Sequence, residues 1–195
     1  MTNPTPAPQA PVASTRTRLL DAAAELFYRE GVGVGVEALC RAAGVSKRSM
    51  YQLFSSKDEL VAASLERIAP YYAAALLPAA DDGRSPRARI LHVFERLEDL
   101  EPAQGFRGCP FVAAAVQVKS PDHPASLVAR RQKDALCSFF QHEAERGGAP
   151  DPAQLARQLT LVFDGASARS VVQAQGLDGL AVATAAALLD GAGVN

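Results

Sequence analysis

One short stretch that begins at Gly44 constrains the fold most, because it encodes the end of one helix and the start of the next. Gly44 suits the left-handed turn that ends a helix, and Ser46 is a preferred N-cap for the following one. Met50, Leu53 and Phe54 then fall on one face at three- and four-residue spacing. The spacing predicts a short helix with an apolar back.

The outward face of that short helix is basic and polar. A helix, a glycine turn and a second helix of this kind form a helix-turn-helix, whose second helix enters the DNA major groove. We expect Lys47, Arg48, Ser49 and Gln52 to face bases, Tyr51 and Lys57 to face phosphates, and Arg41 and Ser46 to complete the DNA-binding set.

The flanking sequence predicts further helices. Apolar residues recur with helical period from 16 to 30 and again from 36 to 43, so three short helices would share a small core. Ser56 and Glu59 have the spacing of a capping box, which predicts a fourth, longer helix with an apolar stripe from Val61 to Tyr72.

The combined motifs resemble the TetR family of bacterial transcriptional regulators. The resemblance rests on Leu26-Phe27 before Gly31, on Ala43-Gly44-Val45-Ser46-Lys47 leading to Tyr51 and Phe54, and on Ser56-Lys57-Asp58-Glu59-Leu60. Residues 1–14 contain four prolines and no charged side chain, which predicts a flexible tail. The resemblance implies an all-α protein with a helix-turn-helix domain (15–60) and a helical domain for effector binding and dimerisation (61–195). It also implies a repressor that binds a palindromic operator as a homodimer.

Two features depart from the family pattern. Gly35 and Val36 replace the hydroxyl residues that often begin the second helix and bind a phosphate, so a backbone amide would have to make that contact. Arg48 stands where the family often has a small residue, which predicts an added contact to guanine.

Composition agrees with a cytoplasmic all-helical protein. The chain has 195 residues, of which 48% are hydrophobic, and neither a transmembrane segment nor a signal peptide is evident. Cys40, Cys109 and Cys137 are odd in number and lack metal-ligand spacing, which suits a reducing compartment. The net charge is only −1, but residues 38 to 57 contain four basic and no acidic side chains. Positive charge is therefore concentrated where phosphates would bind.

Five more helices are expected after the long one, at about 85–100, 109–118, 123–146 with Asp122 as cap, 152–175 and 177–189. The last two carry apolar stripes with many small residues, which favours a four-helix dimer interface. The predicted interface residues are Leu155, Leu159, Val162, Ala166, Leu180, Thr184 and Leu188.

A pocket for a small apolar effector is expected in the same domain, from the family resemblance and from the number of aromatic residues. The candidate lining residues are Tyr71, His92, Phe94, Cys109, Phe111, Phe139, His142 and Phe163, with Asp164 as a further polar anchor. The competing interpretation is that most of these phenylalanines fill the core.

Three alternatives remain at this stage. Cys109 precedes a helix start, and a helix N-terminus can activate a thiol, so a redox-sensing regulator is one hypothesis; burial as a small apolar residue is the other reading of this cysteine. An enzyme would need a nucleophile with its base or a metal cluster, and the three histidines have no carboxylates at ligand spacing. A helical adaptor that binds only protein would leave the acid-free surface unexplained. We therefore predict no cofactor and no metal.

Overall fold

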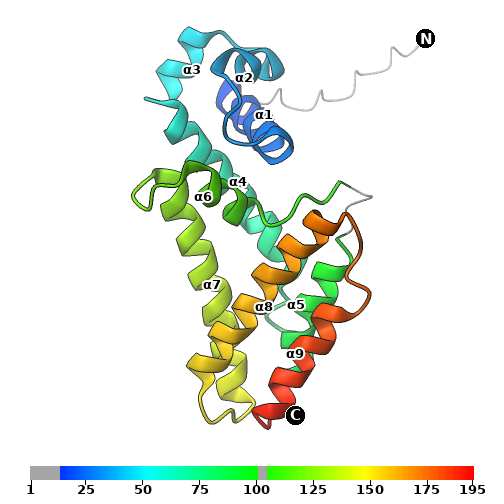
Figure 1. Cartoon of the computed structure of the whole chain (residues 1–195). Coiled ribbons are helices and arrows are strands. Elements are labelled where there is room, and N and C mark those ends of the chain that lie inside the picture. Colours follow the sequence, from blue (N-terminus) through cyan, green and yellow to red (C-terminus); the bar gives the residue numbers. More distant parts are fainter. Residues whose placement is uncertain (1–13, 101–104) are drawn as a thin grey trace, which may run out of the picture.

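The computed structural model describes residues 14–100 and 105–195, and within these ranges it contains nine helices and no strand (Figure 1). The predicted all-α class is confirmed. The predicted tail lies outside the described residues except for Ser14, which caps the first helix. The helices are α1 Thr15–Glu30, α2 Val36–Ala43, α3 Lys47–Leu53, α4 Lys57–Leu76, α5 Pro86–Glu98, α6 Pro110–Val118, α7 Pro124–Arg146, α8 Pro152–Gln173 and α9 Leu180–Gly191.

The local signals around α3 act as the sequence predicted. Gly44 ends α2 in the left-handed region, with φ at +63°. The Ser46 hydroxyl accepts the Ser49 N–H at 3.0 Å. Ser56 caps α4 by accepting the Glu59 N–H at 3.1 Å, but the Glu59 carboxylate accepts the N–H and the hydroxyl of Ser55 instead of returning to Ser56. Each cap satisfies an amide that the helix itself leaves unpaired.

Two predicted helix starts were wrong. His123, not Asp122, caps α7, because its Nδ1 accepts the Ala125 N–H at 3.0 Å. The last helix begins at Leu180 instead of Leu177. Its cap comes from a residue distant in sequence: the Glu98 carboxylate accepts N–H groups of residues 179, 181 and 182 at 2.8–3.0 Å. No local sequence pattern predicts such a cap.

The buried apolar residues form two clusters, and the first combines residues from the N-terminal helices with residues from the second half of the chain. Helices α1 to α3 and most of α4 share it with α6 and the first part of α7, including Cys109, Phe111 and Val128. The second cluster contains residues of α5, the C-terminal part of α7, α8 and α9. Leu76 of α4 belongs to the second cluster, and Tyr72 packs against both. Helix α4 therefore connects the two cores.

The arrangement in space is elongated (Figure 1). Helices α1 to α3 occupy one end, α4 runs from them towards the middle, and the chain ends at the opposite end beside α9. Helix α6 crosses between the three-helix unit and the long helices α7 and α8. This places α3 at an exposed end, where a large partner can approach it.

Candidate nucleic-acid interface and effector cavity

Helix α3 is held by few contacts and presents most of its surface to solvent. Met50 is fully buried beneath it, and Phe54, which follows the helix as its C-cap, is buried as well. The Arg16 guanidinium lies 5.2 Å from the centre of the Phe54 ring, which ties α3 to α1. Arg48, Tyr51 and Gln52 are exposed.

Two residues of α3 differ from the sequence expectation. Leu53 was expected to anchor the helix, but it is exposed, because the helix ends there and Phe54 fills the apolar site. Ser49 is half-buried instead of facing outward, and its hydroxyl lies 2.9 Å from the Ser46 hydroxyl at the cap. Its role in DNA binding stays a prediction, with part of its hydrogen-bonding capacity already used.

The first residue of α3 is paired with an acid from α2. Lys47 Nζ donates to the Glu37 carboxylate at 2.6 Å, and both side chains are more than half exposed. The hydrogen bond from Lys47 lowers the pKa of Glu37 and raises the pKa of Lys47, so both remain charged near neutrality. Arg41 is exposed on the next turn of α2, and Lys57 is half-buried at the start of α4. The sequence shows that residues 38–57 contain no acidic side chain, but it does not show that Glu37, just before this range, pairs with Lys47.

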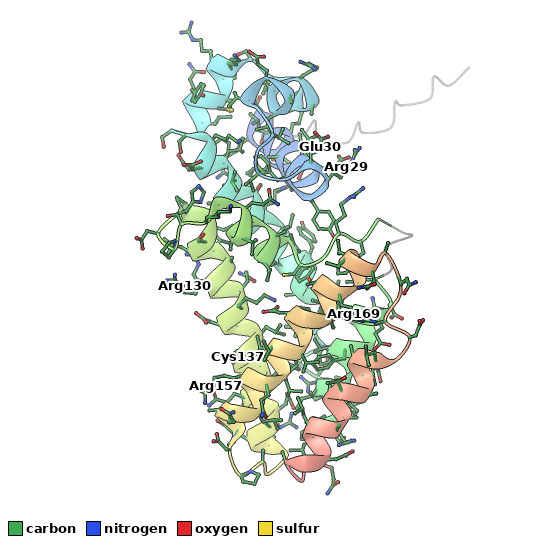
Figure 2. All side chains as sticks on the ribbon, viewed as in Figure 1. Arg29, Glu30, Arg130, Cys137, Arg157 and Arg169 are labelled. Atoms are coloured by element: carbon green, nitrogen blue, oxygen red, sulfur yellow. The ribbon has the colours of Figure 1, made fainter. Side chains whose placement is uncertain are left out.

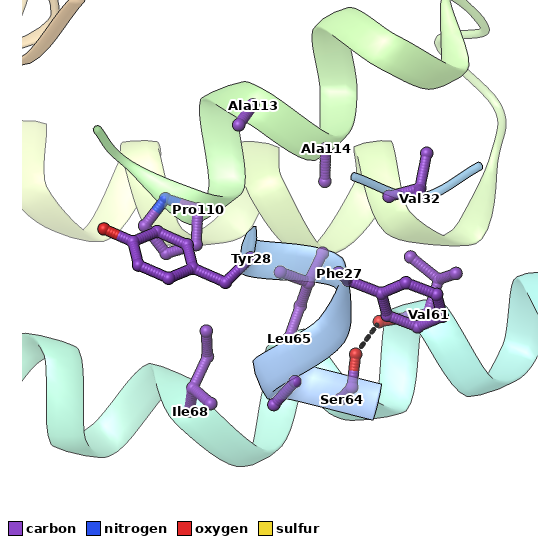
Figure 3. Close-up of a pocket in the computed structure, with 11 residues that line it drawn as sticks. Phe27, Tyr28, Val32, Val61, Ser64, Leu65, Ile68, Pro110, Ala113 and Ala114 are labelled. Carbon is purple, nitrogen blue, oxygen red and sulfur yellow. Dashed lines mark hydrogen bonds between the residues drawn. The ribbon is translucent and has the colours of Figure 1, made fainter. Parts of the chain in front are cut away.

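The three-helix unit is also bound to the loop before α6 and to α6 itself. The Tyr28 hydroxyl donates to the Gly108 carbonyl at 3.2 Å and accepts the Arg107 N–H at 2.7 Å. The Val32 N–H donates to the Gln117 side chain at 2.8 Å. Figure 3 shows Phe27 and Tyr28 of α1 between α4 and α6. Both residues line a cavity of about 20 Å³. A displacement of α6 would therefore strain its contacts with α1 and with the loop that follows α1.

A second cavity, of about 60 Å³, lies between α4, α6, α7 and α8. Three of the predicted pocket residues line it: Cys109, Phe111 and Phe163. Lys133, which the sequence did not single out, lies at the cavity and pairs with Asp164, with its Nζ 4.7 Å from the centre of the Phe163 ring. The remaining lining residues are mainly apolar and include Tyr72, Leu76, Leu77 and Leu136.

The other five predicted pocket residues do not line this cavity. Phe94 and Phe139 pack in or against the second core, where Phe94 stacks on Phe140 at 5.6 Å. His92 is half-buried beside Glu95, and burial followed by the Arg84 charge lowers its pKa. His142 is exposed, so it cannot anchor a buried ligand.

Tyr71 is 71% exposed and lines a separate open cleft of about 360 Å³ between α1 and α4. Its neighbour Tyr72 lines this cleft as well, but only Tyr72 also reaches the 60 Å³ cavity, because one residue turns a helix by about 100°. Burial raises the pKa of Tyr72, and its hydroxyl lacks a hydrogen-bond partner.

Cys109 is 4% exposed, and its N–H donates to the Ser167 hydroxyl at 2.9 Å. Cys40 is buried, and burial raises the pKa of its thiol. Cys137 is half-buried on α7 (Figure 2). These environments suit cysteines that pack as apolar residues.

Comparisons with known proteins agree with this arrangement. Residues 19–64 match the family model for bacterial regulatory proteins of the tetR family. A crystal structure from Streptomyces avermitilis, described as a TetR transcriptional regulator, is 60% identical with a TM-score of 0.91, and the match covers 94% of this chain and 100% of that one. The chain belongs to the TetR family.

A more distant structure has the same fold, and a curated relative matches part of the sequence. The TetR-family regulator SCO4454 from Streptomyces coelicolor superposes with a TM-score of 0.83 at 24% identity, over 92% of this chain and 96% of that one. The HTH-type transcriptional regulator YjdC from Escherichia coli is 28% identical over 92 residues. That match spans 47% of this chain and about half of YjdC, 48% of its length.

Residues 14–100 and 105–195 contain no group of three or more histidine, cysteine or acidic side chains placed to hold a metal ion. Within the same ranges no helix is both long and apolar enough to cross a membrane.

The exposed apolar surface of α8 and α9 differs from the predicted interface. Leu155 and Leu159 are buried in the protomer's own core, at 2% and 0% exposure, so they are not available to a partner. Val162, Ala166 and Leu188 are half-buried, whereas Leu180 and Thr184 are exposed as expected. The sequence stripe identified the inner face of α8. Its outer face carries Leu161 at 73% and Val172 at 78% exposure, with Gly165 and Ala168 between them.

We expect Val172→Glu to give a monomer that keeps its helical content. A charge at an exposed position costs the protomer little, but if the outer face of α8 forms the dimer interface, the charge would be buried there without a partner. Sedimentation velocity measures the result, and Tyr71→Glu, on the exposed side of α4, is the matched control. A Val172→Glu protein that stays dimeric would place the interface elsewhere. A charge at Leu159 is instead expected to unfold the protomer.

Proposed function

We propose that this protein is a homodimeric repressor that binds a palindromic double-stranded DNA operator through α3 and leaves it when a small apolar effector binds between α4, α6, α7 and α8. The observation that carries the DNA-binding part is the exposed face of α3 on a confirmed TetR-family fold. Arg48 and Gln52 are the outward groups best suited to base edges, since arginine pairs with guanine and glutamine with adenine.

Phosphate contacts are assigned to one residue of α3 and to basic residues on the two helices beside it. Tyr51 is 52% exposed, and Lys57 and Arg41 are basic groups on the adjoining helices. Such contacts supply most of the affinity and its dependence on salt, while base contacts supply selectivity. A dimer would present two copies of α3 to successive major grooves, so that a symmetric site is matched by a symmetric protein.

The effector part rests on the cavity and on its links to α1. Its walls are mostly apolar, and the charge of Lys133 in the wall is paired with Asp164, which suits a compact apolar ligand. At about 60 Å³ the cavity has room for only a few water molecules, so a larger ligand would have to push helices apart. Because α4 and α6 both contact the three-helix unit, that displacement would change the spacing of the two recognition helices.

One prediction of the proposed function concerns DNA binding. Arg48→Ala should cost about 1–3 kcal/mol at one base pair of the operator and relax the preference there. Lys57→Ala should weaken binding to all sequences and reduce the slope against salt by about one. Fluorescence anisotropy with DNA flanking the protein's own gene measures both. Arg130→Ala, on α7 (Figure 2), is the charge-matched control. Equal, salt-insensitive binding by all four proteins would exclude this interface.

A further prediction concerns the cavity, which a larger side chain can fill in the way that an effector would. Ala73 lines the cavity on α4, and its neighbour Ala74 is exposed. Ala73→Leu should overpack the cavity and lower operator affinity about 5- to 150-fold, the range of typical coupling energies. Ala74→Leu adds the same atoms outside the cavity and should leave affinity unchanged. If both variants bound operator as the wild type does, the cavity would not control DNA binding.

A further inference from the structure

Glu37 places a carboxylate at the N-terminal end of the recognition helix. It lies in the first turn of α2 and accepts a hydrogen bond from Lys47, the first residue of α3, at 2.6 Å. The side chains are 72% and 55% exposed respectively, so the pair is open to solvent and to DNA.

The surroundings of this carboxylate are positively charged. Arg41 lies one turn further along α2 and its charge also lowers the pKa of Glu37, while Arg48 follows Lys47 on α3. In a helix-turn-helix the first residues of the second helix meet base edges and the first helix crosses the phosphate backbone. Glu37 is therefore an acid within the surface that should meet phosphates.

The pair changes what Lys47 can do. An exposed ion pair contributes little to stability, so it does not fix the structure. While paired, however, Lys47 is neutralised locally and does not add a phosphate contact. Sequence-independent binding consists almost wholly of such contacts and therefore loses most from the pair.

We propose that Glu37 is a selectivity residue that holds Lys47 back from phosphates and so weakens binding to non-operator DNA more than binding to the operator. The inference rests on the proposed function, in which base contacts on the operator fix the register of α3 and direct Lys47 towards bases. On other sequences no base contact fixes that register, and an unpaired Lys47 is free to bind the nearest phosphate.

The test compares wild type, Glu37→Gln, Lys47→Ala and the double variant on an operator duplex and on a scrambled duplex of the same composition. On scrambled DNA, Glu37→Gln should steepen the slope of log K against log salt by about 0.9, which is about eight-fold tighter binding at 0.1 M salt. Operator affinity should rise less, so the ratio of operator affinity to scrambled-DNA affinity falls. In the Lys47→Ala background, Glu37→Gln should no longer tighten binding to scrambled DNA.

Glu25→Gln is the matched control, because Glu25 on α1 forms a comparable exposed pair with Arg29 and the substitution changes the net charge equally. A similar gain in this control, a gain that persists without Lys47, or no gain at all would each overturn the role of Glu37. Because the expected result is tighter binding, unfolding cannot imitate it. A wild type that did not prefer operator DNA would instead refute the proposed function, and with it the inference.

Discussion

The packing of α6 and the first part of α7 against α1 and α4 is the contact on which the rest of the structure depends. Phe111 and Val128 belong to the same buried cluster as Leu39 and Met50, although some 60 to 90 residues separate them in the chain. A three-helix unit of about forty residues buries little apolar surface by itself. Its stability, and hence the presentation of α3, is shared with helices from the other half of the sequence.

In the proposed function, this shared core is the physical route from the cavity to DNA. Cys109 and Phe111 line the cavity at one end of α6, and Gln117 at the other end binds the backbone of Val32. Tyr28 fixes the loop before α6 by two hydrogen bonds. A ligand that moves α6 therefore strains α1 through several contacts at once, and by linkage DNA binding must oppose ligand binding to the same extent.

The sequence predicted the parts that depend on local chemistry. The turn at Gly44, the cap at Ser46 and the family all follow from neighbouring residues. The sequence did not predict features that depend on packing between residues far apart in the chain. An apolar stripe identifies a buried face but does not say whether a partner or the same chain buries it, so Leu159 was misassigned. Similarly, which of two adjacent tyrosines faces a cavity depends on how α4 is rotated against α6 and α7.

Native-state hydrogen exchange tests the shared core most directly. If α1 to α3 depend on α6 and α7, amides of Leu39 and Met50 should open with the same free energy as those of Ala114 and Val128. The opening free energies of these four amides should follow one common curve as the denaturant concentration rises. Phe111→Ala should lower all four together, by about 3–5 kcal/mol if the cavity does not collapse. If Leu39 and Met50 opened at a separate, lower free energy that Phe111→Ala left unchanged, the three-helix unit would be independent and this account would be contradicted.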